Sequence, residues 1–478
     1  MHEFDLDAEA VRQLGYRAVD LAAEHRAGLL DRPVFGKVGD RAAAFDEPLP
    51  ETGLPIDEVL ATVRERILPR PFGNSHPRFF AFINATADPV GIVADYLAAT
   101  MNSNCWGGDH AAIHVEKQVL RWLAAILGLP DESEGILTSG GSMANFTALA
   151  TARCAMAPGV RQDGFAGTEP LVVYASEEVH NCVDKAVDLL GIGWKQLRKI
   201  PTDESYRIRV DLLKQAIAED RRGGRKPAIV VGNAGTVNTG AVDPLEELAD
   251  LCAAEGLWFH ADGAYGAMAT ISKQLKPLFK GLERADSVAA DPHKWLYVPY
   301  EAGATLVREP GRMAAAFQRP APYLVHDPAS PVRGPVSFNE RGPELSRGFK
   351  ALKVWMGLKH HGAKGYAAAV EHDLAMARAL ADAVSGHSDF ELLAPPVLSI
   401  VGFRYRPARR GLAEPELDRL NRQIVNRLVG SGAFFLAPTL LKGRTAMRVA
   451  IVNFRTHEED VRALVEEAAR AGRELPSY

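Results

Sequence analysis

The chain has 478 residues, of which 47% are hydrophobic and 24% are charged, and its formal net charge is −5. This composition is typical of a globular protein and excludes a collagen-like or low-complexity chain. Because the balance is mildly acidic, no basic surface is available for a nucleic-acid partner. The longest uncharged run, residues 135–152, is rich in Gly, Ser, Thr and Asn, so we expect no membrane span.

The cysteines are few and far apart in the sequence, and no two of them form a CxxC pair: Cys105, Cys154, Cys182 and Cys252. This spacing predicts neither a zinc site nor a disulfide framework, and no metal site is expected elsewhere. The acidic N-terminus, residues 1–10, also lacks a basic-then-apolar signal pattern. Together these features predict a cytoplasmic protein.

Three regions follow one another along the chain. Residues 1–70 have helical patterns with no short apolar run between them, which predicts a helical arm that packs on another surface. Residues 71–360 alternate short apolar runs with helical stretches, as a large α/β domain with a mostly parallel sheet does. Residues 361–478 predict a smaller α+β domain. The expected strands of the large domain include Ile136–Leu137, Leu171–Tyr174, Ile229–Val231, Leu257–His260, Ser287–Ala290 and Ala304–Val307.

Polar residues follow several of these expected strands. A Gly/Ser stretch, residues 138–145, follows the first and opens a helix, which suits a phosphate group. His180, Asp262 and the pair His293–Lys294 follow three others. Since ligands bind beyond the carboxyl ends of parallel strands, we expect one crevice to hold them all. Each feature alone has an ordinary structural explanation, whereas their coincidence is less easily explained.

The combination of a phosphate cradle, an acid, a lysine and a flat imidazole suits pyridoxal 5′-phosphate (PLP). Lys294 would form a Schiff base with the cofactor's aldehyde, and Asp262 would keep the pyridine nitrogen protonated. His180 could stack on the ring. Ala264, two residues after Asp262, would let the opposite face pack closely. A metal site is a weak alternative, because the sequence has no HxH or HExxH motif.

At this point the sequence resembles a known family, the group II PLP-dependent amino-acid decarboxylases of fold type I, which include aromatic-L-amino-acid, histidine and glutamate decarboxylases. The resemblance spans nearly the whole chain from about residue 10. Asp-Pro-His-Lys-Trp after Ala-Asp-Ser is its most specific signal. The shared stretches are His76–Phe79, Thr138–Asn145, Tyr174–His180, His260–Gly266, Ala285–Leu296, Leu345–Trp355 and Met447–Asn453.

The resemblance implies roles for individual residues. Lys294 would hold the cofactor, Asp262 would pair with the pyridine nitrogen, and His180 would stack on the ring near the substrate carboxylate. The expected cofactor contacts are Gly141, Ser142, His180, Thr236, Asp262, Ala264, Asp291, His293 and Lys294. The resemblance also implies a homodimer with its active site at the interface and residues 1–70 as the intertwined arm. Phe82, Asn84 and Trp106 would line the substrate pocket, with Ile83 and Asn104 beside them.

Three residues depart from the family's pattern. Asp291 replaces an Asn beside the phosphate, so its carboxylate should face a donor or be turned away. Val237 stands where relatives have a second Thr, and Thr236 could substitute. Phe338, eleven residues before Phe349, aligns with a mobile-loop Tyr that donates a proton in aromatic decarboxylases. A Phe cannot donate that proton.

The expected function is therefore decarboxylation of an L-amino acid, probably aromatic, which would be the small-molecule partner. Phe338 leaves open an aldehyde synthase, which releases aldehyde, ammonia and peroxide instead of an amine. The amides Asn84 and Asn104 leave open a polar or acidic substrate. Transamination on the same fold, a non-catalytic relative and a PLP-free oxidoreductase are weaker alternatives.

Overall fold

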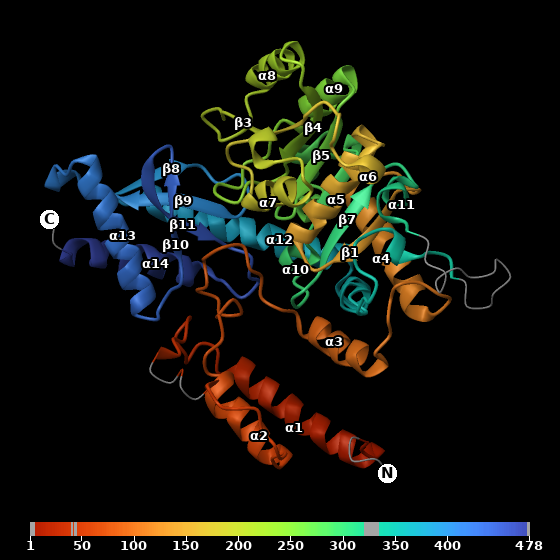
Figure 1. The fold of residues 1–478 in the computed structure, drawn as a ribbon. Helices are drawn as coiled ribbons and strands as arrows, with labels where there is room; N and C mark the ends of the chain where they lie inside the picture. Colours follow the sequence, from red (N-terminus) through yellow and green to blue (C-terminus); the bar gives the residue numbers. More distant parts are fainter. Residues whose placement is uncertain (1–4, 40–41, 43–44, 320–333, 476–478) are drawn as a thin grey trace.

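The computed structural model describes residues 5–39, 42, 45–319 and 334–475. Its centre is a seven-stranded sheet in the order β1-β7-β6-β5-β4-β2-β3 (Figure 1). The strands are β1 (Glu134–Thr138), β2 (Leu171–Ser176), β3 (Leu197–Ile200), β4 (Lys226–Asn233), β5 (Trp258–Gly263), β6 (Ser287–Ala290) and β7 (Gly303–Val307).

The sheet is mostly parallel, as predicted. Strands β2 to β6 run parallel to one another, while β7 is antiparallel to both of its neighbours, β1 and β6. Each expected apolar run forms a strand, but β3 was missed. It is an edge strand with the basic residues Arg198 and Lys199 in its middle, so it lacks the continuous apolar run of the buried strands.

Helices pack around this sheet. The helix α5 contacts five strands, β1, β4, β5, β6 and β7, and so crosses much of the sheet near the Gly/Ser stretch. The helix expected at 115–129 is α4, and Gly128 ends it in a left-handed conformation with φ 77°. The helices of this region are α4 (Ala111–Leu127), α5 (Gly141–Met156), α6 (Val160–Asp163), α7 (Asn181–Leu189), α8 (Val210–Arg222), α9 (Leu245–Glu255), α10 (Pro292–Trp295) and α11 (Arg312–Phe317).

The C-terminal region contains a four-stranded antiparallel sheet in the order β10-β11-β9-β8. The helix α12 leads into it and crosses the predicted boundary at 360/361, beside a break at Gly362. A single bridge between Phe435 and Phe79 precedes β10. The elements are α12 (Ala351–Ser385), β8 (Phe390–Ala394), β9 (Ile400–Tyr405), α13 (Glu414–Gly430), β10 (Ala437–Leu441), β11 (Arg444–Ala450) and α14 (Glu458–Glu474).

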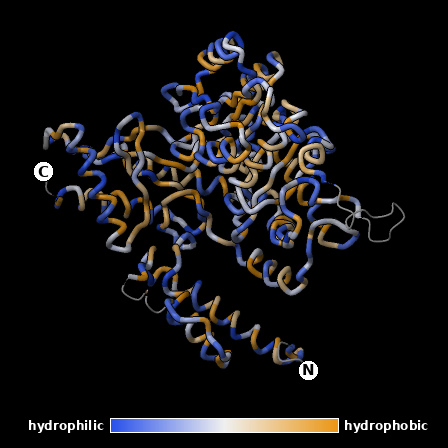
Figure 2. The backbone as a smooth tube through the Cα atoms, viewed as in Figure 1, coloured by the Kyte–Doolittle hydropathy of each residue, from blue (hydrophilic) through white to orange (hydrophobic). Residues whose placement is uncertain are grey.

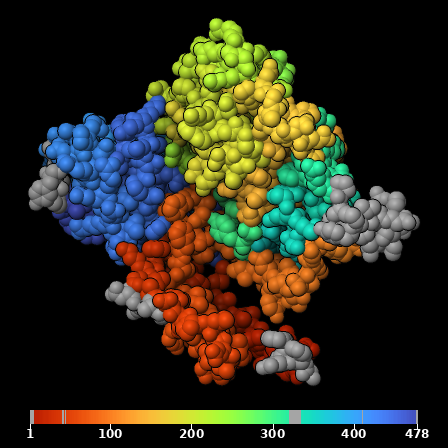
Figure 3. All heavy atoms as spheres, in the orientation of Figure 1, coloured from red at the N-terminus to blue at the C-terminus, as the bar shows by residue number. Residues whose placement is uncertain are grey.

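The helices α1 (Ala8–Ala27) and α2 (Ile56–Thr62) extend from the body of the molecule (Figures 1 and 3). The helix α3 (Pro89–Met101) follows them and packs against α12. No residue of α1 or α2 is buried, and α3 buries only Gly91 and Ala94. Figure 2 shows hydrophobic and hydrophilic positions interleaved along α1, so apolar side chains there face solvent in the single chain. None of the described helices is long and apolar enough to cross a membrane.

Candidate active site

A cavity of about 630 Å³ lies where β4, β5 and β6 end and α5 begins. It brings together most of the residues that the sequence singled out, although they come from segments up to about 200 residues apart. Those that line it are Phe82, Asn84, Gly141, Ser142, His180, Asp262, Ala264, Asp291, His293 and Lys294. The ends of the parallel strands therefore meet at one crevice, as expected.

The Gly/Ser stretch forms one wall of this cavity. Gly140 stands before α5 with φ 144° and makes no side-chain cap, so the first N–H groups of a 16-residue helix face the cavity without a side-chain acceptor. A Cβ at Gly141 would lie 2.8 Å from both Ala264 Cβ and Asp291 Oδ2. Only glycine fits this close approach, and the result is a cradle for an anionic group.

Asp262 is buried at the end of β5. Its Oδ1 accepts a hydrogen bond of 3.2 Å from the backbone N–H of Ala264. Behind it lies His260, whose Nε2 is 2.7 Å from Oδ1 of Asn145. Burial lowers the pKa of His260 to about 4, so a neutral imidazole supports the Asp262 strand.

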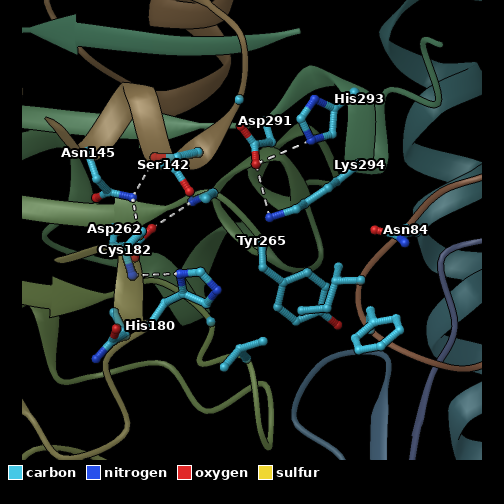
Figure 4. A pocket seen from close by; sticks show the side chains of 18 of the residues that line it. Asn84, Ser142, Asn145, His180, Cys182, Asp262, Tyr265, Asp291, His293 and Lys294 are labelled. Carbon is cyan, nitrogen blue, oxygen red and sulfur yellow. Dashed lines mark hydrogen bonds and ion pairs between the residues drawn. The ribbon is translucent and has the colours of Figure 1, made fainter. Parts of the chain in front are cut away.

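Lys294 and His293 converge on a single carboxylate, Asp291 (Figure 4). Asp291 Oδ2 is 3.0 Å from Lys294 Nζ and 3.5 Å from His293 Nε2. His293 Nδ1 accepts from the backbone N–H of Ala302, and burial lowers the pKa of His293 to about 4, so its proton resides on Nε2. The unusual Asp291 thus faces donors rather than turning away.

His180 caps the N-terminus of α7 and borders the cavity. Its Nδ1 accepts a 3.2 Å hydrogen bond from the backbone N–H of Cys182. Burial is the main cause that lowers the pKa of His180, so the neutral ring is favoured. With Nδ1 occupied as an acceptor, the proton of that ring lies on Nε2, which is free to donate to a ligand.

Arg448 is one of the cavity residues that sequence reasoning missed. It is 5% exposed, and its guanidinium donates to the carbonyls of Val237 and Phe82. Burial lowers its pKa to about 10, and the described residues give it no carboxylate partner. Arg448 belongs to the shared stretch 447–453, but nothing in the sequence marked it as a site residue. This arginine gives the cavity a fixed positive charge.

Tyr300 is the second residue that was missed. Its hydroxyl donates to Oδ1 of Asn84 at 2.9 Å, and its ring lies 4.5 Å from that of His293. This hydrogen bond supplies a partner for the amide of Asn84. Tyr300 and Phe82 are each 48% exposed, so both lie at the open side of the cavity. Phe82 also stacks on Phe72, which gives this side an aromatic surface.

Three predicted site residues do not line the cavity of the described chain. The hydroxyl of Thr236 is 2.9 Å from that of Thr239 instead. The carbonyl of Trp106 accepts from the backbone N–H of Asn339. Phe338 is 0% exposed, and the guanidinium of Arg347 lies 5.0 Å from its ring centroid. The structure therefore does not bring Phe338 to Lys294, and its role in catalysis stays a prediction.

The residues of the cavity fit PLP. The glycine cradle at α5 suits a phosphate, and the partly buried Lys294 and the buried Asp262 provide an amine and an acid. The His293 ring and the Lys294 amine stand beside the carboxylate of Asp291, so donors face it at the cradle. Within the same residues no His, Cys, Asp and Glu cluster could hold a metal ion.

Comparison with known proteins identifies the same chemistry. The pyridoxal-dependent decarboxylase conserved domain matches residues 39–406. An aromatic-L-amino-acid decarboxylase from Bacillus atrophaeus is 38% identical, with 97% of each chain covered. A phenylacetaldehyde synthase from Arabidopsis thaliana is 29% identical and covers 99% of this chain and 97% of its own. The crystal structure of Oryza sativa TDC with PLP and tryptamine has a TM-score of 0.92 at 28% identity, with 98% and 99% covered.

Proposed function

Because the chain belongs to the pyridoxal-dependent decarboxylase family, it is a PLP-dependent carboxy-lyase, and we propose that it decarboxylates an aromatic L-amino acid. The observation that carries the proposal is the cavity itself. It combines Lys294, Asp262 and His180 with a fixed cation, Arg448, and an aromatic open side at Phe82. An aromatic substrate side chain can stack on such a surface.

We assign a separate role to each of several cavity residues. Lys294 would hold the cofactor, Asp262 would keep its pyridine nitrogen protonated, and Gly141 and Ser142 would bind its phosphate at the start of α5. When bound, PLP accepts the electron pair that the departing carboxylate leaves behind. His180 would cover the ring and offer its Nε2 proton.

Arg448 and His180 support recognition of the substrate's α-carboxylate. The buried guanidinium has no carboxylate partner among the described residues, and an anion in the cavity would supply one. His180 can add a neutral N–H donor. A decarboxylase must hold this carboxylate without stabilising it too strongly, and a neutral imidazole donor is suited to that task.

A second candidate is an aldehyde synthase. It is favoured by the phenylacetaldehyde synthases of Arabidopsis thaliana and Petunia hybrida among the relatives, at 29% and 28% identity, and by Phe338 at the aligned loop position. Decarboxylation remains the better supported activity, because the decarboxylase from Bacillus atrophaeus is 38% identical.

Product analysis separates the two functions. Purified protein loaded with PLP is incubated in air with L-Tyr, L-Trp, L-Phe, L-Dopa, L-Glu and L-Asp, and amine, aldehyde and peroxide are assayed. We expect an amine from an aromatic substrate, with no peroxide. Aldehyde with stoichiometric peroxide would establish the second function. Turnover confined to L-Glu or L-Asp would contradict the aromatic substrate class.

We also propose a homodimer with the active site at its interface. The arm supports this, because α1 exposes apolar side chains that include Val11, Tyr16 and Val19. Outside the arm, α3 also exposes Val93 and Tyr96. An exposed apolar surface of this extent is typical of a protein interface. The open side of the cavity, at Phe82 and Tyr300, would then face the partner subunit.

A cytoplasmic location is part of the same proposal. All the cysteines are free and buried, and burial raises the pKa of the thiols of Cys105, Cys182 and Cys252. Such cysteines behave as small core residues rather than as redox groups. A reducing compartment is consistent with them.

A further inference from the structure

Asp373 is a buried carboxylate outside the cavity that the proposed chemistry does not use. It lies on the second half of α12 and is 0% exposed. No lysine or arginine forms an ion pair with it among the described residues. Instead it accepts three hydrogen bonds. Oδ2 accepts from Trp295 Nε1 at 3.1 Å and from the Tyr297 hydroxyl at 2.7 Å, and Oδ1 accepts from the backbone N–H of Asn453 at 3.2 Å.

Two of these donors belong to the turn that follows Lys294. Tyr297 has φ 48°, a left-handed conformation that is unfavourable for a residue with a side chain. Such a conformation persists only where its surroundings hold it. Here the buried Tyr297 ring is held at its hydroxyl by Asp373, and its carbonyl accepts from the N–H of Asp88.

The neighbouring Trp295 connects the same carboxylate to the cavity wall. Its buried ring lies 4.8 Å from the ring of Tyr265, which lines the cavity. Its indole N–H is the second donor to Oδ2 of Asp373. One oxygen thus accepts a hydrogen bond from each of two side chains that closely follow Lys294 in the chain.

The third donor brings in the C-terminal region. Asn453 follows β11, and its side-chain N–H donates to the carbonyl of His76. Its backbone N–H binds the second oxygen of Asp373. The carboxylate therefore joins the Lys294 turn, α12 and the segment after β11 at one buried point.

We propose that Asp373 is a positioning residue, which anchors the turn after Lys294 to α12 and to Asn453 and so holds the lysine amine in place for the cofactor. The inference rests on the proposed PLP chemistry. A carboxyl group suits this position because its two oxygens can accept from all three donors. An asparagine would direct an N–H at one of them, and a leucine would leave all three without a partner.

The test uses full-length protein loaded with PLP and the variant Asp373→Asn, which keeps the shape of the side chain. Misplacement of a reacting group by about 1 Å costs roughly 10²-fold in rate, so we expect kcat to fall by roughly 10- to 100-fold. KM should change little, because Arg448 and the open side of the cavity are untouched. The visible absorption band of the lysine-bound cofactor should shift, and the cofactor should dissociate faster on dilution.

The chain offers a matched control for a purely structural effect. Tyr297→Phe removes one hydroxyl that donates to Asp373 at 2.7 Å, and Tyr174→Phe removes a buried hydroxyl that donates to Asp220 at the same distance. Both should lose similar thermal stability, because both leave a buried carboxylate short of one donor. Only Tyr297→Phe should also lower kcat and alter the absorption band.

Three results would overturn the inference. One is an Asp373→Asn variant with the kcat and absorption band of the wild type. Another is a Tyr174→Phe variant whose kcat and band change as much as those of Tyr297→Phe. If Asp373→Asn does not fold, a Tyr297→Phe variant with unchanged kcat and band would be decisive against it. A wild-type protein that shows no band with PLP would overturn the proposed function, and the inference with it.

Discussion

The cavity and the N-terminal arm of this chain are organised in opposite ways. Around the cavity, Asp262, Asp291 and His293 are buried and have partners from several segments. The helix α1 buries no residue and exposes Tyr16 and Val19. A single chain therefore buries these cavity residues, whereas the apolar side chains of α1 are covered by nothing in the same chain. Each prediction below tests one side of this contrast.

The largest effect is expected at Lys294. Lys294→Ala removes the amine that would hold the cofactor, so turnover should fall by roughly 10³-fold or more. The visible absorption band of the lysine-bound cofactor should disappear in the same variant. Far-UV circular dichroism should remain as in the wild type, because the side chain of Lys294 lines the cavity. A variant that retains band and turnover would show that the site is elsewhere.

A smaller loss is expected at Asp262. Asp262→Asn keeps the size of the side chain and its contact with the Ala264 N–H, but removes the negative charge that would hold the pyridine nitrogen protonated. Loss of one such electrostatic contact costs roughly 10²-fold in kcat. Thermal stability should fall far less than turnover. Equal losses of stability and turnover would reduce Asp262 to a structural residue.

A substitution in the arm should change the assembly state of the protein first. Val19 is 64% exposed on α1, and Val19→Asp would place a charge in the proposed interface. Sedimentation velocity should show a shift from dimer to monomer, with roughly tenfold or greater weakening of association. The matched control is Leu440→Asp, since Leu440 on β10 is 61% exposed but lies outside the arm. Its sedimentation should equal that of the wild type.

The outcome at Val19 also bears on the cavity. If the open side at Phe82 and Tyr300 faces a partner subunit, the monomeric variant should lose turnover together with assembly. A fully active monomer would contradict the placement of the active site at the interface. A wild-type protein that sediments as a monomer would contradict the dimer itself.

The same contrast explains what could be predicted from sequence. The Gly/Ser stretch, Asp262 and Lys294 were found because each directly follows a short apolar run, and strand ends are local features. Arg448 and Tyr300 were missed as site residues, because only the packing of distant segments brings them to the cavity.

Phe338 shows a limit of sequence reasoning, although its role in catalysis stays a prediction. Its distance of eleven residues from Phe349 aligned Phe338 with a catalytic loop position, but spacing in the sequence does not show whether a side chain is buried. In the described chain its ring is enclosed, with the guanidinium of Arg347 over one side, and Arg347 itself pairs with the buried Glu116. Spacing predicts neighbours within one element well, whereas the direction of a side chain in an irregular segment depends on tertiary contacts.

The smallest expected effect is a change in how stability depends on pH. The pKa of His260 is about 4 in the folded chain and about 6.5 when unfolded, so the unfolded chain binds the proton more tightly. The neutral His260 ring therefore makes its full contribution to the free energy of unfolding above pH 6.5. This contribution is lost as the pH falls towards 4, and the loss is about 3 kcal/mol at most. The variant His260→Gln lacks this proton and keeps an N–H for Asn145.

The measurement is the difference in unfolding free energy between wild type and His260→Gln, from pH 7 to 4.5. The buried carboxyls Asp243 and Asp373 have raised pKa values, about 6 and 7, so their contributions change in the opposite direction with pH. Both carboxyl groups are present in the wild type and in His260→Gln, so their contributions cancel in the difference in unfolding free energy. The wild type should lose more stability than the variant on acidification. Parallel curves for wild type and His260→Gln would show that folding does not lower the pKa of His260, and the support of the Asp262 strand by a neutral imidazole would then lose its basis.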